Sequence, residues 1–278
     1  MASVITASEP SWIAPFAGLS PRRFNKLVTT VRRESVADGH RGRPWSLSLE
    51  DRILLVVVYW RTNLTMRQLA PLFGVSRSAA CRIIDHLGPL LALQPRQRFR
   101  KDTVLIVDGT LVPTRDRTIA EQSKNYRYST AHQVVIDADS RLVVVIGRPL
   151  PGNRHDSRGW AESGTKDAVG TTITIADGGY QGTGLVIPHR RQKGRNLPAW
   201  KEEHNRSHKR VRARVEHTFA RMKGWKILRD CRLKGDGVHH AMLGIARLHN
   251  LALAGKGTSS HGSRLCPHQR GDHLRDIL

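Results

Sequence analysis

Three acidic residues lie at the ends of apolar runs or beside the apolar stripe of a helix, where burying a carboxylate costs free energy. Asp108 ends the apolar run TVLIVD, Asp177 ends the run TTITIAD, and each is followed by glycine. Glu216 lies within RVRARVEHTF, where the helical spacing of apolar residues puts it at a core-facing edge. Carboxylate oxygens suit Mg²⁺ or Mn²⁺, and paired divalent ions support phosphoryl transfer. The pattern indicates a metal-dependent phosphoryl-transfer site, although for either aspartate alone Asp-Gly is also an ordinary turn dipeptide.

These acids lie in a strongly basic chain. The sequence carries 46 Lys and Arg residues against 23 Asp and Glu residues, a formal net charge of +23. Between residues 189 and 234, 16 basic residues accompany only 4 acidic ones. A field of this sign attracts polyanions, so nucleic acid is the expected partner. The alternatives are a solubilising surface or a GC-rich genome that favours arginine codons. Codon bias could explain why Arg outnumbers Lys, but it does not explain a twofold excess of bases over acids.

Length and composition exclude several classes of protein. With 278 residues, 39% of them hydrophobic, the chain can form a real core in one large or two modest domains. Its three cysteines are odd in number and widely spaced, which argues against a disulfide scaffold and favours a reducing compartment. No apolar run approaches the roughly 18 residues of a membrane span, and the start lacks a signal-peptide pattern. We therefore expect a cytoplasmic protein with no membrane partner.

The first 100 residues are expected to form an all-α domain. Ser48 predicts the start of a helix over residues 49–60. Thr65 opens a shorter helix, MRQLAPLF, although a proline inside a helix costs roughly 3 kcal/mol. A Gly-Val turn follows, and Ser76 caps a third helix, RSAACRIIDHL. Over about residues 47–91 this arrangement is that of a helix-turn-helix.

The third of these helices would carry the sequence-specific contacts. Arg77, Ser78 and Arg82 fall on its exposed side and would face the major groove of double-stranded DNA, where such side chains contact base edges. Helix-turn-helix patterns also occur as plain structural hairpins. The charge of the chain favours the DNA-binding interpretation.

Residues 101–254 have the pattern of an α/β domain. TVLIVDG and TTITIADGG predict buried strands, AHQVVIDA and RLVVVIG predict a hairpin, and GLVIPH predicts a shorter strand. Helices are expected near Asp156 and over about residues 198–223. Strands that partly alternate with helices indicate an α/β fold. Residues 255–278 are rich in Gly, Ser, His and Arg and are expected to form a flexible basic tail.

Four motifs occur in a fixed order along the chain: VDGT at Asp108, PGNRHDS, IADGGYQG at Asp177, and RVRARVEHTFARMKGWKIL at Glu216. Together they resemble the DDE-type transposases of the bacterial insertion-sequence-five group, which are related to the Harbinger nucleases. The resemblance covers about residues 47–253. It implies a ribonuclease-H-like catalytic domain preceded by the helix-turn-helix domain. It also implies that Asp108, Asp177 and Glu216 form a catalytic triad that holds two Mg²⁺ or Mn²⁺ ions.

The same resemblance assigns further positions and a function. Arg212 and Lys223 match basic positions of the family motif and would grip phosphate, whereas Lys209 stands where the family has tyrosine. The implied protein is a transposase that binds the terminal inverted repeats of its own insertion element, cleaves the DNA ends and joins them to target DNA. It would act as a homo-oligomer in a synaptic complex, associated with the bacterial nucleoid.

Two other functions share these residues. A catalytically silent DNA-binding regulator derived from a transposase would keep the helix-turn-helix, but it has no need for three carboxylates in a basic field. A metal-dependent DNA nuclease without strand transfer would need every residue named here. The sequence leaves that second alternative open.

Asp156 could compete with Asp177 for the second metal position. It follows the turn-like segment PGNRH and precedes SRGWAE, so we expect it to be the N-cap of a short helix. An asparagine accepts the same capping bonds. On this view Asp156→Asn keeps most metal-dependent nicking, whereas Asp177→Asn loses it.

Overall fold

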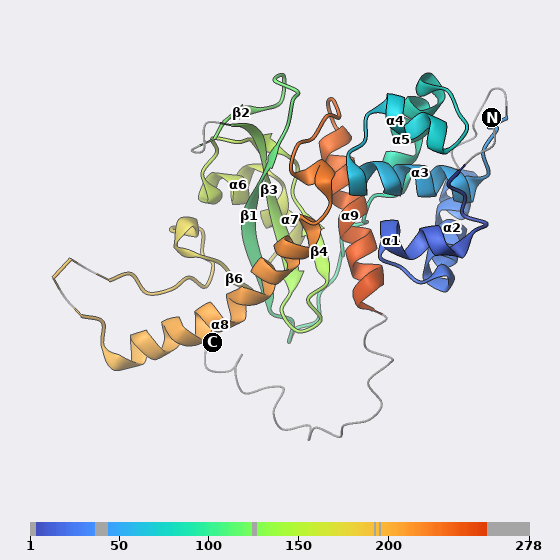
Figure 1. Ribbon diagram of the computed structural model, residues 1–278. Helices are drawn as coiled ribbons and strands as arrows, with labels where there is room; N and C mark the ends of the chain where they lie inside the picture. The colour runs from blue at the N-terminus through green and yellow to red at the C-terminus, as the bar shows by residue number, and fades with distance from the viewer. Residues whose placement is uncertain (1–3, 37–43, 124–126, 192, 195, 255–278) are drawn as a thin grey trace. The chain divides into compact units, whose positions relative to one another are not determined.

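The computed structural model describes residues 4–36, 44–123, 127–191, 193–194 and 196–254. The tail expected over residues 255–278 lies outside these described residues. The chain divides into a helical unit and an α/β unit (Figure 1). Among the described residues, the helical unit comprises 4–36, 44–93, 113–118 and 222–254, and the α/β unit comprises 94–112, 119–123, 127–191, 193–194 and 196–221.

The helical unit is built around α3, a helix that is buried on all sides. Every side chain of α3 from Ile53 to Trp60 is buried, as expected for a helix that is hydrophobic all round. Helix α9 approaches it closely at Gly244, where an added Cβ would lie 2.3 Å from the Trp60 ring. The described elements of this unit are η1 (Pro10–Trp12), α1 (Ile13–Ala17), α2 (Pro21–Val36), α3 (Leu49–Thr62), α4 (Met66–Leu72), α5 (Arg77–Leu90), η3 (Lys226–Leu228) and α9 (Gly237–Leu253).

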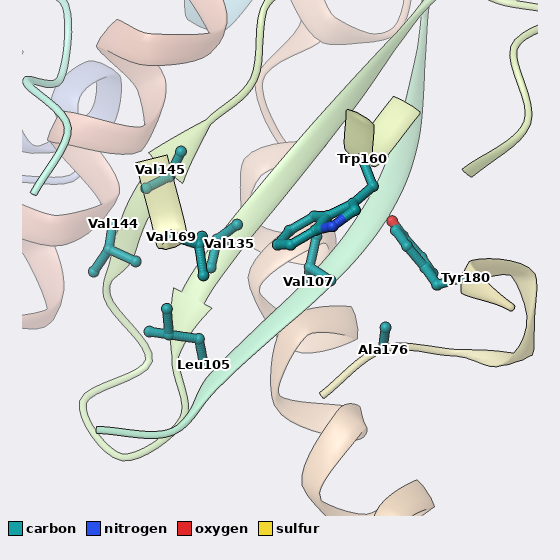
Figure 2. Packing of buried hydrophobic residues seen from close by; sticks show 9 residues of the cluster. All are labelled: Leu105, Val107, Val135, Val144, Val145, Trp160, Val169, Ala176 and Tyr180. Atoms are coloured by element: carbon teal, nitrogen blue, oxygen red, sulfur yellow. The ribbon is translucent and has the colours of Figure 1, made fainter. Parts of the chain in front are cut away.

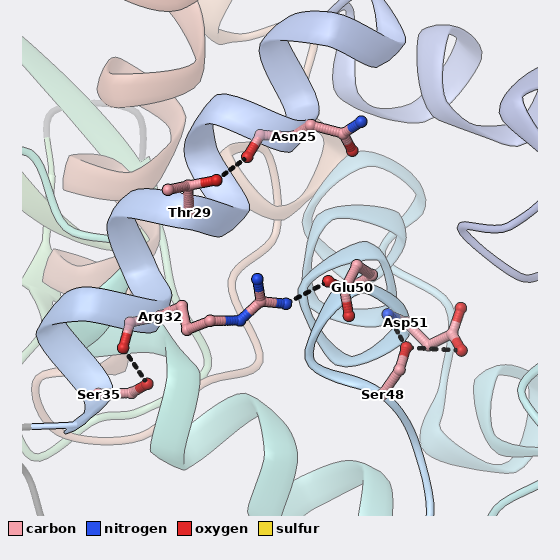
Figure 3. Close-up of polar contacts among 7 residues, drawn as sticks. All are labelled: Asn25, Thr29, Arg32, Ser35, Ser48, Glu50 and Asp51. Atoms are coloured by element: carbon pink, nitrogen blue, oxygen red, sulfur yellow. Dashed lines mark hydrogen bonds and ion pairs between the residues drawn. The ribbon is translucent and has the colours of Figure 1, made fainter.

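The start of α3 follows from its capping residue, as the sequence predicts. The Ser48 hydroxyl accepts a hydrogen bond from the Asp51 backbone N–H at 3.1 Å and donates to Asp51 Oδ2 at 2.9 Å (Figure 3). An exposed ion pair between Arg32 and Glu50 joins α2 to α3 in the same view. The cap satisfies a backbone donor that the first turn of a helix otherwise leaves unpaired.

Helices α4 and α5 form the expected helix-turn-helix. Gly74 adopts a φ of 62°, a left-handed conformation that favours glycine, and the turn returns the Val75 N–H to the Ala70 carbonyl at 3.1 Å. Ser76 then caps α5 by accepting a hydrogen bond from the Ala79 N–H at 3.1 Å. Leu69 and Ile83 are buried in this unit. The three helices predicted between residues 49 and 87 are therefore confirmed.

The α/β unit contains a mixed sheet in which β1 lies between β3 and β6. Strands β1 and β6 are parallel, whereas β3 and β4 form the antiparallel hairpin expected from the sequence. Short strands β2 and β5 also pair with β3. The described elements of this unit are β1 (Leu105–Pro113), β2 (Glu121–Gln122), β3 (Tyr128–Asp137), β4 (Val143–Ile146), β5 (Leu150–Pro151), α6 (Asp156–Glu162), α7 (Thr165–Val169), β6 (Thr174–Ile175), η2 (Gly178–Tyr180) and α8 (Ala199–Met222).

The core of the α/β unit joins the sheet to its helices (Figure 2). Val107 of β1 and Val135 of β3 pack with Trp160 of α6, Val169 of α7 and the buried Tyr180 of η2. This packing fixes the end of β1 against the segments that follow β5 and β6.

The first predicted strand is longer than expected, because β1 does not end at Asp108 but continues in the sheet to Pro113. Two of the other predicted strands are shorter than expected. In TTITIADGG only β6 pairs as a strand, because the glycines after Asp177 turn the chain into η2. GLVIPH contributes a single parallel bridge between Ile175 and Val186 rather than a strand. The long helix predicted for residues 198–223 is confirmed as α8. Among the described helices, none is both long enough and apolar enough to cross a membrane.

Candidate active site

Strands β1 and β6 carry two aspartates to neighbouring positions. The parallel register pairs Leu105 with Thr174 and Ile106 with Ile175. Asp108 and Asp177 each lie two residues beyond the paired isoleucines, and Asp177 keeps an extended backbone with φ −82° and ψ 179°. If this register continues for two more residues along both segments, Asp108 lies opposite Asp177, and both side chains lie on one face of the sheet. The sheet thus brings together the first two members of the proposed triad.

Asp108 is held in a half-buried, polar environment. Its Oδ1 accepts a hydrogen bond from the Gly109 N–H at 2.9 Å, and its Oδ2 accepts from Arg212 Nη2 at 3.0 Å. Burial raises the pKa of the Asp108 carboxyl, the Arg212 guanidinium opposes this shift, and the negative charge of Asp177 adds to it. The two aspartates therefore interact electrostatically.

Asp177 is held by the turn that follows it. Its Oδ1 accepts a hydrogen bond from the Gly179 N–H at 2.8 Å, which makes Asp177 the N-cap of η2. Behind this turn, the buried Tyr180 hydroxyl donates a hydrogen bond to Gln133 Oε1. Burial raises the pKa of Tyr180, and the charges of Asp156, Asp108 and Asp177 raise it further, so three carboxylates act on one phenol.

Helix α8 supplies the remaining predicted residues of the α/β unit. Val211 and Val215 are buried, and Arg212 reaches Asp108 from the same stretch of helix. Glu216 is exposed, so its expected place at a core-facing edge is wrong. It lies one turn beyond Arg212, because residues four apart share a helix face. Among the described residues, no three His, Cys, Asp or Glu side chains converge on one point to hold a metal ion.

Asp156 does not occupy the helix-capping position that the sequence suggests for it. Asp156 is the first residue of α6 and His155 is its N-cap, so the expectation that Asp156 caps this helix is wrong. A Cβ added at Gly109 would lie 2.3 Å from Asp156 Oδ1, which puts this carboxylate against the residue after Asp108. The motif PGNRHDS was the available signal, but only tertiary packing reveals the contact.

A pocket of about 420 Å³ opens beside these acids. Its lining includes Gly109 and Thr110 of β1, residues 153–156 and Gly179. Thr110 is 7% exposed, and its hydroxyl has no hydrogen-bond partner among the described residues. The wall of the pocket thus combines a glycine of β1, a glycine of η2, a buried hydroxyl and the polar start of α6.

The predicted DNA-contacting residues lie in the helical unit. Arg77, Ser78 and Arg82 are all exposed on α5. Arg77 and Ser78 line an open pocket with Thr65, Ser76 and other residues of α4 and α5. Lys223 is exposed just after α8, in the helical unit, whereas Arg212 belongs to the α/β unit.

The fold and the site together define a class of protein. A mixed sheet with β1 between an antiparallel hairpin and a parallel strand, and with aspartates following the β1–β6 pairing, is the ribonuclease-H-like arrangement. The α/β class and the preceding helix-turn-helix domain are confirmed. A catalytic α/β domain beside a basic helix-turn-helix is typical of an enzyme that acts on DNA.

Comparison with known proteins identifies the family. Residues 99–251 match the family described as "Transposase DDE domain", and residues 45–97 match "Helix-turn-helix of DDE superfamily endonuclease". The chain therefore belongs to the DDE transposase family, and it is an insertion-sequence transposase with a helix-turn-helix and a DDE catalytic domain.

Two relatives of this chain are themselves named as transposases of insertion-sequence elements. A "Putative transposase for insertion sequence element IS112" from Streptomyces albus G is 80% identical over 256 residues, which cover 92% of this chain and 100% of the relative. A "Probable transposase for insertion sequence element IS702" from Microchaete diplosiphon is 28% identical over 232 residues, covering 76% and 83%. A cryo-EM structure of a piggyBac transposase synaptic complex with hairpin DNA has a TM-score of 0.47 at 11% identity, covering 96% of this chain and 78% of that one.

Proposed function

We propose that the protein binds the terminal inverted repeats of its own insertion element, hydrolyses a phosphodiester bond at each end and joins the freed 3′-hydroxyls to target DNA. The observation that carries this proposal is the parallel pairing of β1 with β6, which sets Asp108 and Asp177 side by side in a DDE transposase domain. Asp108, Asp177 and Glu216 are its catalytic carboxylates.

The donor set fits a hard divalent cation. Two aspartates on adjacent strands present carboxylate oxygens, and the charge of Asp177 acts on Asp108 in a half-buried environment that disfavours two unbalanced negative charges. Asp108, Asp177 and Glu216 would together hold two Mg²⁺ or Mn²⁺ ions. Such ions, when bound, activate the attacking oxygen and stabilise the leaving one.

Arg212 has two tasks in this site. Its Nη2 holds Asp108 Oδ2 at 3.0 Å and so fixes the orientation of that carboxylate. Its Nε–H has no hydrogen-bond partner among the described residues. This Nε–H is buried, so we assign the contact with the DNA backbone to the guanidinium N–H groups that do not hold Asp108, with Lys223 as a second phosphate contact.

Recognition of the element ends belongs to α5. Arg77, Ser78 and Arg82 are exposed on this helix of the helix-turn-helix, and the first two lie within its first turn, where a recognition helix contacts base edges in the major groove. Two ends must be cut and joined together, so we propose that the protein acts as a homo-oligomer in a synaptic complex on the bacterial nucleoid.

The test is an assay with a labelled element end, a target plasmid and Mg²⁺. We expect the parent protein to cleave the labelled end and to join it covalently to the plasmid. Cleavage without joining would identify a nuclease without strand transfer. Specific binding without cleavage would identify a DNA-binding regulator, and either result would overturn the proposed function.

A further inference from the structure

Asp156 lies between strand β1 at Gly109 and the turn at Gly179, the two segments that carry the proposed catalytic aspartates. Its Oδ1 is 2.3 Å from the position of a Cβ at Gly109, the residue after Asp108. Its Oδ2 is 3.1 Å from the position of a Cβ at Gly179, and Asp177 Oδ1 is 3.0 Å from the same point. One carboxylate therefore reaches both segments, and the absence of a side chain at each glycine makes room for it.

The position of Asp156 in the chain fits a role in the site better than a role in capping. His155 occupies the N-cap of α6, and Asp156 is the first helical residue. Both residues line the pocket of about 420 Å³ beside Gly109 and Gly179. The nearby Thr110 hydroxyl is buried without a hydrogen-bond partner among the described residues, so this wall offers further polar capacity for a bound group.

We propose that Asp156 is an additional metal-binding carboxylate of the active site, beside Asp108 and Asp177. This inference rests on the proposed function, because it assigns a residue to the divalent-metal site named there. Asp156 and Asp177 bring carboxylate oxygens near one point at Gly179, and like charges that lie close together repel one another. A divalent ion favours oxygen ligands of this kind and would offset the repulsion.

A structural role makes a different prediction. An aspartate in the first turn of a helix stabilises it through the helix dipole, and in that case its neutralisation lowers stability whether or not metal is present. Asp167 provides a matched control, because it is an exposed aspartate in the first turn of the next helix, α7. Neutralising Asp156 alone should affect metal binding if the carboxylate is a ligand.

The experiment is calorimetric titration of the full chain with MnCl₂, together with thermal unfolding of the metal-free protein. We expect Asp156→Asn to lower Mn²⁺ affinity at least tenfold while the metal-free unfolding temperature stays the same or rises. Asp167→Asn should bind Mn²⁺ like the parent. Parent-like Mn²⁺ affinity in Asp156→Asn would overturn the proposal.

Two further variants separate this inference from the proposed function. Asp108→Asn and Asp177→Asn should both lose Mn²⁺ binding. If they do and Asp156→Asn does not, only the role of Asp156 fails. If all three bind like the parent, the proposed active site fails as well.

Should Asp156→Asn lack a cooperative unfolding transition, Gly109→Ala decides the question. This variant keeps every carboxylate but places a Cβ where Asp156 Oδ1 lies. We expect at least a tenfold loss of Mn²⁺ affinity, and parent-like affinity would overturn the proposal.

Discussion

Arg212 is the cation that balances the half-buried Asp108. The pair is separated by 3.0 Å, with 19% and 16% of the two side chains exposed. A charged hydrogen bond of this kind contributes about 1.5–3 kcal/mol, and its loss leaves an uncompensated carboxylate. By contrast, the pair of Arg100 and Asp102 is largely exposed, and such surface pairs contribute about 0–1 kcal/mol.

We therefore expect Arg212→Gln to lower the free energy of unfolding by about 1–3 kcal/mol, and Asp108→Asn in the same chain to restore most of the loss. Arg100→Gln should change it by less than about 1 kcal/mol. Urea unfolding of the single and double variants measures these differences. Losses that simply add in the double variant would show that the two side chains are not coupled.

His208 makes folding sensitive to acid. It is 2% exposed, and its Nε2 lies 3.2 Å from the Val186 carbonyl oxygen. Burial lowers the pKa of His208 below its ordinary value of 6.5. The unfolded chain therefore takes up a proton before the folded chain does, and stability falls as the pH drops below 6.5.

Replacing His208 by glutamine should flatten this dependence. We expect the unfolding free energy of the parent to fall between pH 6.5 and the lowered pKa of His208, at up to about 1.4 kcal/mol per pH unit from this group, and His208→Gln to lose that slope. His217→Gln removes an exposed histidine and serves as the control. Equal slopes in the parent and in His208→Gln would refute the assignment.

At the scale of elements, the turn between α4 and α5 decides how the recognition helix is presented. Gly74 has a φ of 62°, whereas Gly88 lies within α5 and has room for a Cβ, with its nearest neighbour at 3.7 Å. A side chain in the left-handed region costs about 1–2 kcal/mol, but alanine in a helix interior is favoured over glycine by about 1 kcal/mol. The two positions therefore respond oppositely to one substitution.

We expect Gly74→Ala to destabilise the protein by about 1–2 kcal/mol and to weaken binding to element ends, and Gly88→Ala to stabilise it by up to about 1 kcal/mol. Chemical denaturation and a gel-shift titration measure the two effects. Stabilisation by Gly74→Ala would contradict the turn geometry.

Local chemistry explains which elements the sequence could predict. Ser48 and Ser76 each accept a backbone hydrogen bond at the start of a helix, so the caps located α3 and α5 in advance. The apolar runs of β3 and β4, separated by the turn residues Asp139 and Ser140, likewise predicted the hairpin. These features depend on residues close together in the chain.

The rest depends on packing between distant segments. Asp156 meets Gly109 only because the start of α6 lies against the middle of β1, and no local pattern encodes that contact. The exposure of Glu216 was missed because an apolar stripe fixes the buried face of a helix but not the position of its edge. The order of the motifs along the chain also did not predict that α9 belongs to the same unit as the N-terminal helices.

At the scale of the whole molecule, the net charge of +23 favours non-specific attraction to DNA, and we propose that α5 sets the choice of sequence. We expect Arg77→Ala with Arg82→Ala to reduce the preference for element ends over unrelated DNA, since each good base contact is worth about 1–3 kcal/mol. Lys223→Ala should weaken binding to both DNAs equally and flatten its salt dependence. Competition binding at several salt concentrations measures this, and unchanged discrimination in the double variant would make the helix-turn-helix purely structural.

The central claim is that Asp108 and Asp177 act together with Glu216 in one metal-dependent site. The most direct measurement is Mg²⁺-dependent nicking of a labelled element end by Asp108→Asn, Asp177→Asn and Glu216→Gln, with DNA binding measured on the same samples. Because each change removes a charge on which divalent binding depends, we predict that all three variants lose nicking while they bind DNA like the parent. A variant that nicks as fast as the parent would contradict the site.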